Sequence, residues 1–510
     1  MQQRIHHAAG ATICALAILA AAACAPDSGP AEDSQDVRGV LRLGHQLGVS
    51  TWDPATSVGG SETRLLNLVH DRLVHLTPDG TLAPGLASSW RFNKDGTELT
   101  LELRPRLTFS DDTPIDADVV KANLDRARTK QGSTLKAGLS GVTGVQAVDG
   151  DTVRITLKEA DTSLPALLSE RFGMIVKVGS ADSAYPDPVG TATSGMFRVT
   201  RNQTGVSFAL KRNATFWDAA STELSGVEVT VLKDATARLN ALRSGQADLT
   251  LVDPDQLEEA ESLPSVKVLP TTTFNLAAVW LNSKLIPEFD DPRVRRALNL
   301  ATDRRALVEG IALGYAEPAS QPYPKGYYAH NEAYEFPYDP ATARKLIADA
   351  GVTGLEVPFV VTSPLAKTAE ALQDQWKKVG IKLDVRPLAG FGVAEQLWQR
   401  KTAPAGMAPY TGRPDPAIVF SMFHLPGQPT NPGDIVDPDI TELVGASKAE
   451  QDAEKRAHIF RQIAQASVER PQGVIPLYFP QEGVVFRDSV KGIRPWLDGF
   501  PDLENVRVSR

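Results

Sequence analysis

The chain has 510 residues, which is too many for one hydrophobic core and predicts a division into two or three domains. Its formal net charge is −9, and no local cluster of lysine and arginine offers the basic face of a nucleic-acid-binding protein. The only cysteines are Cys14 and Cys24, so the chain beyond them has no disulfide framework, zinc cluster or cysteine nucleophile.

The N-terminal segment predicts export. A basic stretch around Arg4 precedes an apolar run over residues 8–23, which is shorter than the roughly 20 residues that a membrane-crossing helix needs. Cys24 follows three alanines, as in a lipoprotein cleavage site, although an ordinary cleavage site with a chance cysteine is the alternative. We expect a signal peptide over 1–23 and a flexible tether over 24–39, whose lipidated Cys24 holds the protein on the outer face of the cytoplasmic membrane.

Beyond the tether, apolar and polar residues alternate in several short segments, which predicts half-buried strands. The clearest alternating sets are Leu99, Leu101 and Leu103; Val153, Ile155 and Leu157; Val227, Val229 and Val231; and Ile381, Leu383 and Val385.

Between these strands, helices are predicted to begin at aspartates, whose carboxylates accept hydrogen bonds from the free backbone N–H groups of a first turn. These N-caps are Asp116 or Asp118, Asp234, Asp291 and Asp339. The arginines of residues 290–308 are expected on a solvent-exposed helix face, because Val294, Leu298, Leu307 and Ile311 occupy the other face. The succession of strands and helices predicts layered α/β domains.

A series of motifs occurs in one order along residues 41–480. The longest covers residues 69–128 and begins VHDRLVHLTPDGTLAPGLASSW. The others are Trp52-Asp53-Pro54-Ala55, RNATFW at 212–217, RLNALRSGQADL at 238–249, LNSKLIPEFDDPRVRRALNLATDR at 281–304, YDPATARKLIADAG at 338–351, Pro414-Asp415-Pro416 and VIPLYF at 474–479. Together they resemble family 5 of the extracytoplasmic solute-binding proteins of ABC transporters, which serve oligopeptides, dipeptides and nickel.

The resemblance implies an α/β fold with two lobes, of the type II periplasmic-binding-protein kind, and an extra α/β domain inserted in lobe one. Lobe one would take residues 40–70, 190–270 and 483–510, the inserted domain 71–189, and lobe two 271–482. It also implies a monomeric receptor without a cofactor. Such a receptor encloses a small solute between its lobes and delivers it to a membrane complex of ABC permease and ATPase.

The resemblance places one ligand-lining segment just after the Leu-Asp-Pro turn of the family, where this chain has Val58, Gly59 and Gly60. Glycines there would let the backbone approach a ligand closely, and a plain turn is an equally good interpretation. The second lining segment lies around the Pro-Asp-Pro motif. Its candidates are Tyr410, Gly412, Arg413 and Asp415, with Phe391 as a further apolar wall.

Gly412 departs from the family pattern. Peptide-binding members often carry an aspartate at this position, where it pairs with the α-ammonium group of the peptide, so its absence argues against ordinary capture of a peptide amine. The planar guanidinium of the neighbouring Arg413 could instead hold a carboxylate or phosphate, while a solvated loop arginine is the alternative.

A nickel site is not predicted, because the histidines beyond the tether lack ligand spacing. They are His45, His70, His75, His330, His424 and His458. A metal carried inside an organic chelate stays open.

A penicillin-recognising serine hydrolase or transpeptidase is the alternative from another class, since Ser133 and Lys136 form a Ser-x-x-Lys pattern. Its partner motifs Lys-Thr-Gly and Ser-Asp-Asn are absent from the sequence, so we expect no enzyme. An envelope sensor or chaperone built on the receptor fold stays open.

Overall fold

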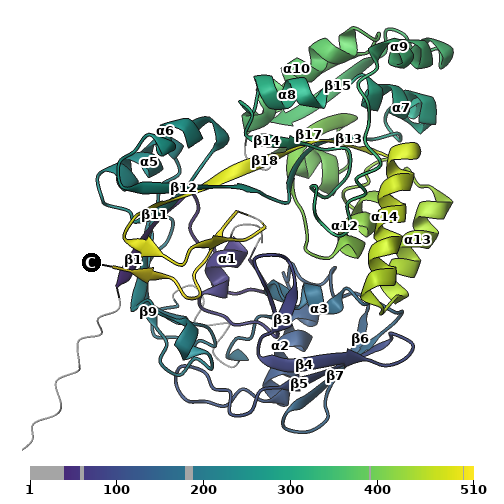
Figure 1. The fold of residues 1–510 in the computed structure, drawn as a ribbon. Helices are drawn as coiled ribbons and strands as arrows, with labels where there is room; N and C mark the ends of the chain where they lie inside the picture. Colours follow the sequence, from purple (N-terminus) through teal and green to yellow (C-terminus); the bar gives the residue numbers. More distant parts are fainter. Residues whose placement is uncertain (1–38, 58–61, 179–187, 390–391, 498, 510) are drawn as a thin grey trace, which may run out of the picture. The chain divides into compact units, whose positions relative to one another are not determined.

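The computed structural model describes residues 39–57, 62–178, 188–389, 392–497 and 499–509, and two β-sheets with their covering helices organise this part of the chain (Figure 1). The larger sheet draws strands from most of the sequence, and the smaller one has four strands between residues 87 and 157. The predicted mixed α/β class is confirmed. Among the described helices, none combines the length and the apolar composition that crossing a membrane requires.

Two halves make up the larger sheet. In spatial order, the first half contains β11 (Leu249–Val252), β1 (Val40–His45), β10 (Gly226–Val231), β9 (Ser207–Arg212) and β8 (Phe197–Gln203). The second half contains β13 (Asn275–Leu281), β17 (Ala405–Thr411), β15 (Glu356–Thr362) and β16 (Lys382–Leu388). Strand β1 is parallel to β10 and β11, and β15 is parallel to β16 and β17.

The long strand β18 (Val474–Arg487) belongs to both halves. Its first residues pair with β13, and its last residues pair with β11 and with β12 (Val266–Thr272). The chain also passes from one half to the other between β12 and β13 (Figure 1). Because Thr272 is paired with Gln481, these two crossings lie side by side.

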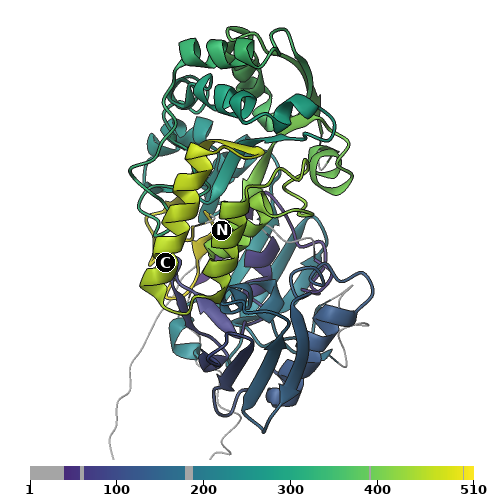
Figure 2. The same ribbon diagram turned by 90° about the vertical axis from the view of Figure 1, so that its right-hand side faces the viewer.

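The side chains of β13 alternate between two hydrophobic cores, since successive residues of a strand point to opposite faces. Ala277, Val279 and Leu281 pack with α7 to α10, whereas Leu276, Ala278 and Trp280 pack with α12 to α14. Figure 2 shows α13 and α14 side by side. The bounds of these helices are α7 (Pro292–Leu300), α8 (Arg304–Gly310), α9 (Pro340–Asp349), α10 (Ala366–Lys377), α12 (Pro416–His424), α13 (Pro438–Ala449) and α14 (Ala453–Glu469).

The smaller sheet is antiparallel and has the order β4 (Ala87–Phe92), β5 (Glu98–Leu103), β7 (Thr152–Leu157) and β6 (Val142–Ala147). Helix α2 (Ala117–Thr129) belongs to the core of this sheet. The predicted alternating leucines of β5 are all buried, and Leu101 is paired with Val153 of β7. The hairpin β2 (Val74–Leu76) to β3 (Leu82–Pro84) and the short helix α3 (Leu164–Leu167) flank the sheet in sequence.

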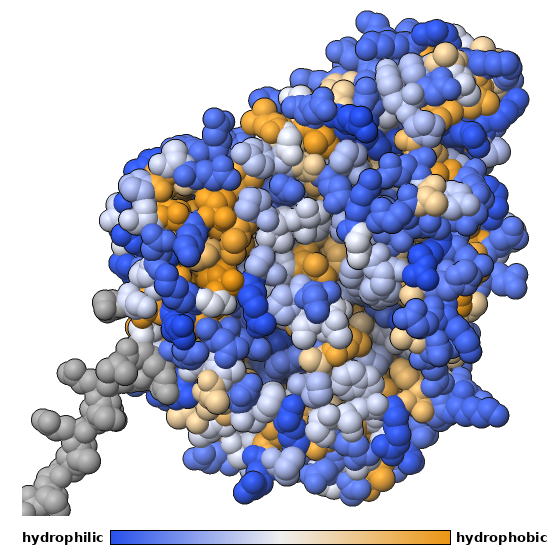
Figure 3. Space-filling model, in the orientation of Figure 1, coloured by the Kyte–Doolittle hydropathy of each residue, from blue (hydrophilic) through white to orange (hydrophobic). Residues whose placement is uncertain are grey.

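Helices α5 (Ala235–Arg243) and α6 (Leu257–Glu261) form a small core with β11 and β18. Figure 3 shows a largely hydrophilic face with an apolar patch in the region of β11 and β12. Further elements are α1 (Glu62–Asn67), α11 (Gly392–Ala394), β14 (Ala316–Pro318), β19 (Val490–Lys491), β20 (Arg494–Pro495), β21 (Pro501–Asp502) and β22 (Arg507–Val508).

The predicted helix starts are confirmed. Asp116 caps α2, with its Oδ1 3.0 Å from the backbone nitrogen of Val119. Asp234, Asp291 and Asp339 cap α5, α7 and α9 in the same way.

The expectation that all arginines of residues 290–308 face solvent is wrong for two of them. Arg295 on α7 is buried, and its guanidinium donates to the carbonyl oxygens of Pro471 at 2.6 Å and Phe289 at 2.7 Å. Arg304 on α8 is buried too, and its Nε donates to the carbonyl oxygen of Ala319 at 2.7 Å. Backbone carbonyls from distant segments satisfy both groups, so they serve as core side chains.

Candidate functional site

The turn after β1 is fixed to the smaller sheet. The carboxylate of Asp53 accepts a hydrogen bond from the backbone nitrogen of Ala55 at 3.0 Å, and it forms a two-pronged ion pair with Arg126 of α2 at 2.8 and 2.5 Å. Bidentate pairs of this kind fix geometry as well as charge. Val58, Gly59 and Gly60, predicted to line the ligand next in the chain, lie outside the described residues, as do Phe391 and Cys24.

Tyr410 near the end of β17 is a core residue. It is buried against Trp280, Trp398 and Phe423, and its hydroxyl lies 3.4 Å from the sulfur of Met422. Burial raises the pKa of the Tyr410 phenol above its ordinary value. Tyr410 therefore packs in the core under β17, and its predicted role as an apolar wall for a ligand stays a prediction.

Gly412 lies where the backbone of a neighbouring segment passes closely. Its nitrogen donates to the carbonyl oxygen of Phe274 at 2.9 Å, and a Cβ atom at Gly412 would meet the Cβ of Phe274 at 2.8 Å. A larger side chain such as aspartate at this position would require Phe274 to move. The close approach of Phe274 thus favours glycine here.

Asp415 is engaged within the protein. It caps α12 through the backbone nitrogen of Ala417 at 2.9 Å, and its two oxygens pair with the guanidinium of Arg456 at 2.7 and 2.8 Å. Asp415 is 4% exposed. The guanidinium of Arg456 on α14 therefore balances the negative charge of Asp415 within the protein itself.

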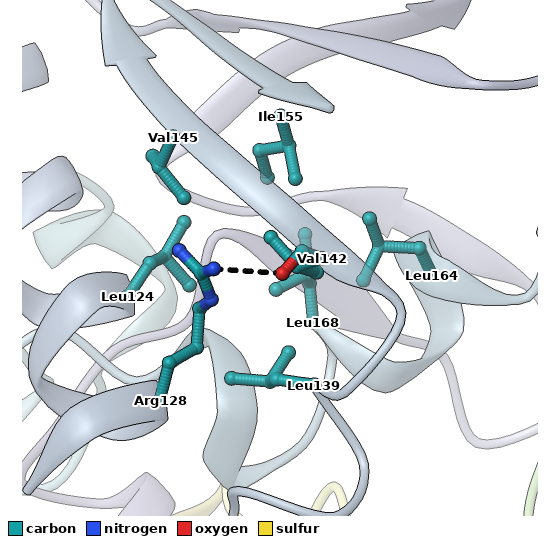
Figure 4. Close-up of a pocket in the computed structure, with 8 residues that line it drawn as sticks. All are labelled: Leu124, Arg128, Leu139, Val142, Val145, Ile155, Leu164 and Leu168. Atoms are coloured by element: carbon teal, nitrogen blue, oxygen red, sulfur yellow. Dashed lines mark hydrogen bonds between the residues drawn. The ribbon is translucent and has the colours of Figure 1, made fainter. Parts of the chain in front are cut away.

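Asp415 and Arg456 lie on the wall of a cavity of about 710 Å³ between the smaller sheet and α14. Aromatic rings from both sides line it, among them Trp90 and Phe92 of β4 and Phe460 of α14. A volume of this order would hold a small molecule. A second void, under the smaller sheet, has no room for water: aliphatic side chains surround it and Arg128 donates to the carbonyl oxygen of Val142 at 2.7 Å (Figure 4).

Arg413 forms an ion pair with Glu170, which follows α3. The Arg413 side chain is 36% exposed and that of Glu170 is 15% exposed, so the pair is half buried. The negative charge of Glu170 raises the pKa of Arg413. The alternative of a merely solvated loop arginine is therefore wrong, although the carboxylate that Arg413 holds belongs to the chain itself.

Arg171, next to Glu170, was missed by sequence reasoning. Its Nη1 atom donates to the carbonyl oxygens of Pro54 at 3.1 Å and Ser57 at 2.5 Å, and to the hydroxyl of Thr134 at 3.1 Å. Arg171 is 8% exposed, and burial, followed by the positive charge of Arg413, lowers its pKa to about 10. The signal was a charged pair inside an otherwise apolar run, LPALLSERFGMIV, since buried charges need partners.

Ser133 and Lys136 do not form the pair that the alternative hydrolase interpretation would require. The hydroxyl of Ser133 donates to the carbonyl oxygen of Ala127 at 2.6 Å, and Lys136 is exposed. Residues 131–140 form turns, so the lysine does not lie one helical turn from the serine. Within the described residues, no three histidine, cysteine or acidic side chains gather closely enough to hold a metal ion.

Comparison with known proteins identifies a family and several relatives that the chain resembles. Residues 81–431 match the family described as bacterial extracellular solute-binding proteins, family 5, middle region. The chain is 28% identical over 373 residues to Di/tripeptide-binding protein 1 of Pseudomonas aeruginosa. This alignment covers 66% of the chain and 69% of the relative. It is 29% identical over 361 residues to the glutathione-binding protein GsiB of Escherichia coli K12, covering 68% of this chain and 69% of the relative.

A solved structure shares the fold. It is DppA, an ABC transporter-associated periplasmic binding protein of Helicobacter pylori, in complex with the peptide STSA. The TM-score is 0.79 at 22% identity, and the match covers 94% of this chain and 100% of the other chain.

Proposed function

The chain belongs to the bacterial extracellular solute-binding proteins of family 5, and from this premise we propose that it captures a small solute by closing two lobes around it. Lobe one would comprise residues 40–70, 190–270 and 483–510, with the inserted domain at 71–189, and lobe two would comprise 271–482. Support comes from the two adjacent crossings of the chain, at residues 272–275 and within β18. Two adjacent connections of this kind, which run in opposite directions, can act as a hinge.

The ion pair between Glu170 and Arg413 carries this proposal. Glu170 belongs to the proposed inserted domain and Arg413 to lobe two, so the pair joins parts that the hinge lets separate. Two further contacts support it: the backbone nitrogen of Thr162 donates to the carbonyl oxygen of Lys448 at 2.9 Å, and Gln451 donates to that of Asn93 at 2.9 Å. A solute that touches both sides stabilises the closed state by its differential affinity, and the permease recognises that state.

The solute is proposed to be a peptide-like or other small organic molecule. Relatives named for di- and tripeptides and for glutathione support this class. Gly412 argues for a means of binding other than pairing with a peptide amine. Hydrolysis at Ser133 is not part of the proposed function, and a penicillin label is expected to leave Ser133 unmodified.

The proposal also includes lipid attachment at Cys24, which would hold the protein on the outer face of the membrane. The receptor is proposed to be a monomer. The motif at 21–24 supports the anchor. Cys24→Ala should shift the protein from the membrane fraction to the soluble fraction, and retention of the variant on membranes would contradict the anchor.

Capture of a solute is tested with residues 25–510, which contain the compact unit formed by Arg38–Arg510. The purified protein is unfolded mildly, and the released small molecules are identified by mass spectrometry. We expect a defined organic solute, and adding it back should raise the melting temperature. If nothing is released and no candidate solute shifts the melting temperature, the receptor proposal fails.

A further inference from the structure

Strand β4 is an edge of the smaller sheet. It pairs with β5 on one side, and no described strand pairs with its other side. In an antiparallel pair, opposing residues alternate between those that bond to each other and those whose N–H and C=O groups point away from the partner strand. The backbone nitrogen of Asn93 donates to the carbonyl oxygen of Glu98 at 2.9 Å, so these two residues form a bonded pair.

This alternation decides which backbone groups of β4 are left without a strand partner. Arg91 lies two residues before Asn93, so it bonds to β5. Trp90 and Phe92 occupy the alternate positions, and their N–H groups and carbonyl oxygens point off the edge of the sheet. No described residue bonds to these groups in place of the missing strand. Such an edge is a template for one more extended chain.

The edge borders the cavity of about 710 Å³ that α14 also lines. Trp90, Arg91 and Phe92 form part of its wall, and Tyr328 forms another part. The rings of Trp90 and Phe92 are half-buried and Tyr328 is 42% exposed, so aromatic surface is accessible there. An extended peptide along β4 would place alternate side chains against these rings, and a space of this volume takes a ligand of such size.

The wall of the cavity carries an excess of negative charge. Its two arginines are both paired, Arg456 with Asp415 and Arg91 with Glu102 of β5. Its remaining charged residues are Asp79, Glu450 and Glu454. No described lysine or arginine forms an ion pair with these three carboxylates. The wall therefore favours a basic ligand, whose cations the aromatic faces also attract.

This cavity differs from the predicted solute site. Of the described residues predicted to line the solute, only Asp415 lies on its wall, and Arg456 already balances the charge of Asp415. Gly412 and Arg413 are not part of the wall. The edge of β4 is thus available to a ligand other than the one held at those residues.

We propose that the edge of β4 is a second binding site, which takes a short basic peptide as a fifth strand of the smaller sheet. The peptide backbone pairs with Trp90 and Phe92, and its lysine or arginine side chains lie near Glu450 and Glu454. Main-chain pairing supplies affinity in this mode of recognition, and the wall of the cavity supplies the preference for charge. The site goes beyond the proposed capture of a solute between lobes.

Blocked tetrapeptides test the site on residues 25–510. The probe is acetyl-Lys-Val-Lys-Val-amide, and its charge-reversed match is acetyl-Glu-Val-Glu-Val-amide, so neither peptide has a charged terminus. Affinities are measured by calorimetry, with and without a saturating amount of the solute released from the native protein. We expect the basic probe to bind about 10-fold more tightly than the acidic one, and the solute should not displace it.

Backbone pairing is tested from the side of the ligand. Two versions of the basic probe carry N-methyl groups, either on both lysines or on both valines. Only one alternating set of peptide N–H groups faces β4. One version should therefore bind about 10-fold more weakly, while the other should keep its affinity to within about threefold. Equal effects of the two modifications would contradict strand pairing.

Variants test the same bonds from the side of the protein. Phe92→Ala and Phe92→Pro both remove the ring, but only proline removes the N–H group that points off the edge, a position where strands tolerate proline. The proline variant should bind the basic probe about 3- to 10-fold more weakly than the alanine variant. If the proline variant does not fold, the N-methylated probes decide the same point.

The contribution of charge has its own variant and control. Glu450→Gln combined with Glu454→Gln should weaken binding of the basic probe by about 3- to 10-fold. Glu442→Gln, exposed on α13 and outside the cavity wall, should leave the affinity unchanged.

The outcomes separate this site from the receptor function. Absence of binding, equal binding of the basic and acidic probes, or displacement of the basic probe by the released solute overturns the second site and leaves the receptor proposal intact. The receptor proposal fails on a different result, which is that no solute is released and none raises the melting temperature.

Discussion

At the residue scale, the glycine beside Arg413 owes its identity to Phe274. A Cβ atom at Gly412 would lie 2.8 Å from the Cβ of Phe274. Gly412→Asp should therefore lower the free energy of unfolding by about 1–3 kcal/mol, the usual cost of forcing extra atoms into packed structure. Urea unfolding measures this.

The matched control for that substitution is Gly445→Asp. Gly445 lies on the exposed face of α13, and a Cβ there meets nothing within 4 Å. We expect its effect to stay within about 0.5 kcal/mol. Equal effects of the two substitutions would argue against the steric explanation.

His424, at the end of α12, predicts acid sensitivity. Burial lowers its pKa to about 4, whereas in the unfolded chain it titrates near the ordinary value of about 6.5. Between these values the unfolded chain binds the extra proton, so the histidine's contribution to stability is lost as pH falls from about 6.5 toward 4. Urea unfolding at several pH values should show a smaller loss for His424→Gln than for the unaltered protein.

The control for His424 is the exposed His458 on α14. His458→Gln should leave the pH dependence of stability almost unchanged. A pH dependence that is identical in the His424 and His458 variants would contradict the assignment.

Whether the role of a single residue could be predicted from the sequence depends on how far along the chain its hydrogen-bond partners lie. Asp116, Asp234, Asp291 and Asp339 could be assigned from sequence because an N-cap binds backbone groups two or three residues on. Arg171 could not, since its acceptors at Pro54 and Ser57 lie more than 100 positions away.

At the scale of elements, α7 carries a buried and an exposed arginine one position apart. Arg295→Met removes the donors that satisfy the carbonyl oxygens of Pro471 and Phe289 and should lower the free energy of unfolding by about 2–4 kcal/mol. Arg296→Met, on the solvent side, should stay within about 0.5 kcal/mol. Urea unfolding of both variants checks this, and a costly Arg296→Met would contradict the assignment of faces.

Strands and helices were predictable where their periodicity was strong, as for β5 and β7, whose alternating residues are buried. Their spatial order was not, because it depends on pairing between distant segments. Strand β13, buried on both faces, lacks the alternation that marks a half-buried strand. The exposure of individual arginines on α7 and α8 could not be predicted either, because loops far from these helices cover Arg295 and Arg304, and a helical pattern gives no information about them.

At the scale of the whole molecule, closure of the lobes predicts a change in size. Adding the solute released from the native protein should reduce the radius of gyration measured by small-angle X-ray scattering, because the ligand-free ensemble includes open states. An unchanged radius of gyration at saturating solute would contradict the hinge.

Arg413→Ala removes the ion pair with Glu170 and should weaken solute binding by about 3- to 10-fold.

Strand β18 also constrains when the protein can fold. Strands β11 and β12 end by residue 272, yet both pair with residues 481–487 of β18, more than 200 positions later. The first half of the larger sheet therefore stays incomplete until nearly the entire polypeptide has been synthesised. Pairing over such separations is slow, because closing a long loop costs entropy before the native contacts can form. The sheet can therefore close only after residues 474–487 have been synthesised, so most of the polypeptide is made before this part of the core can form.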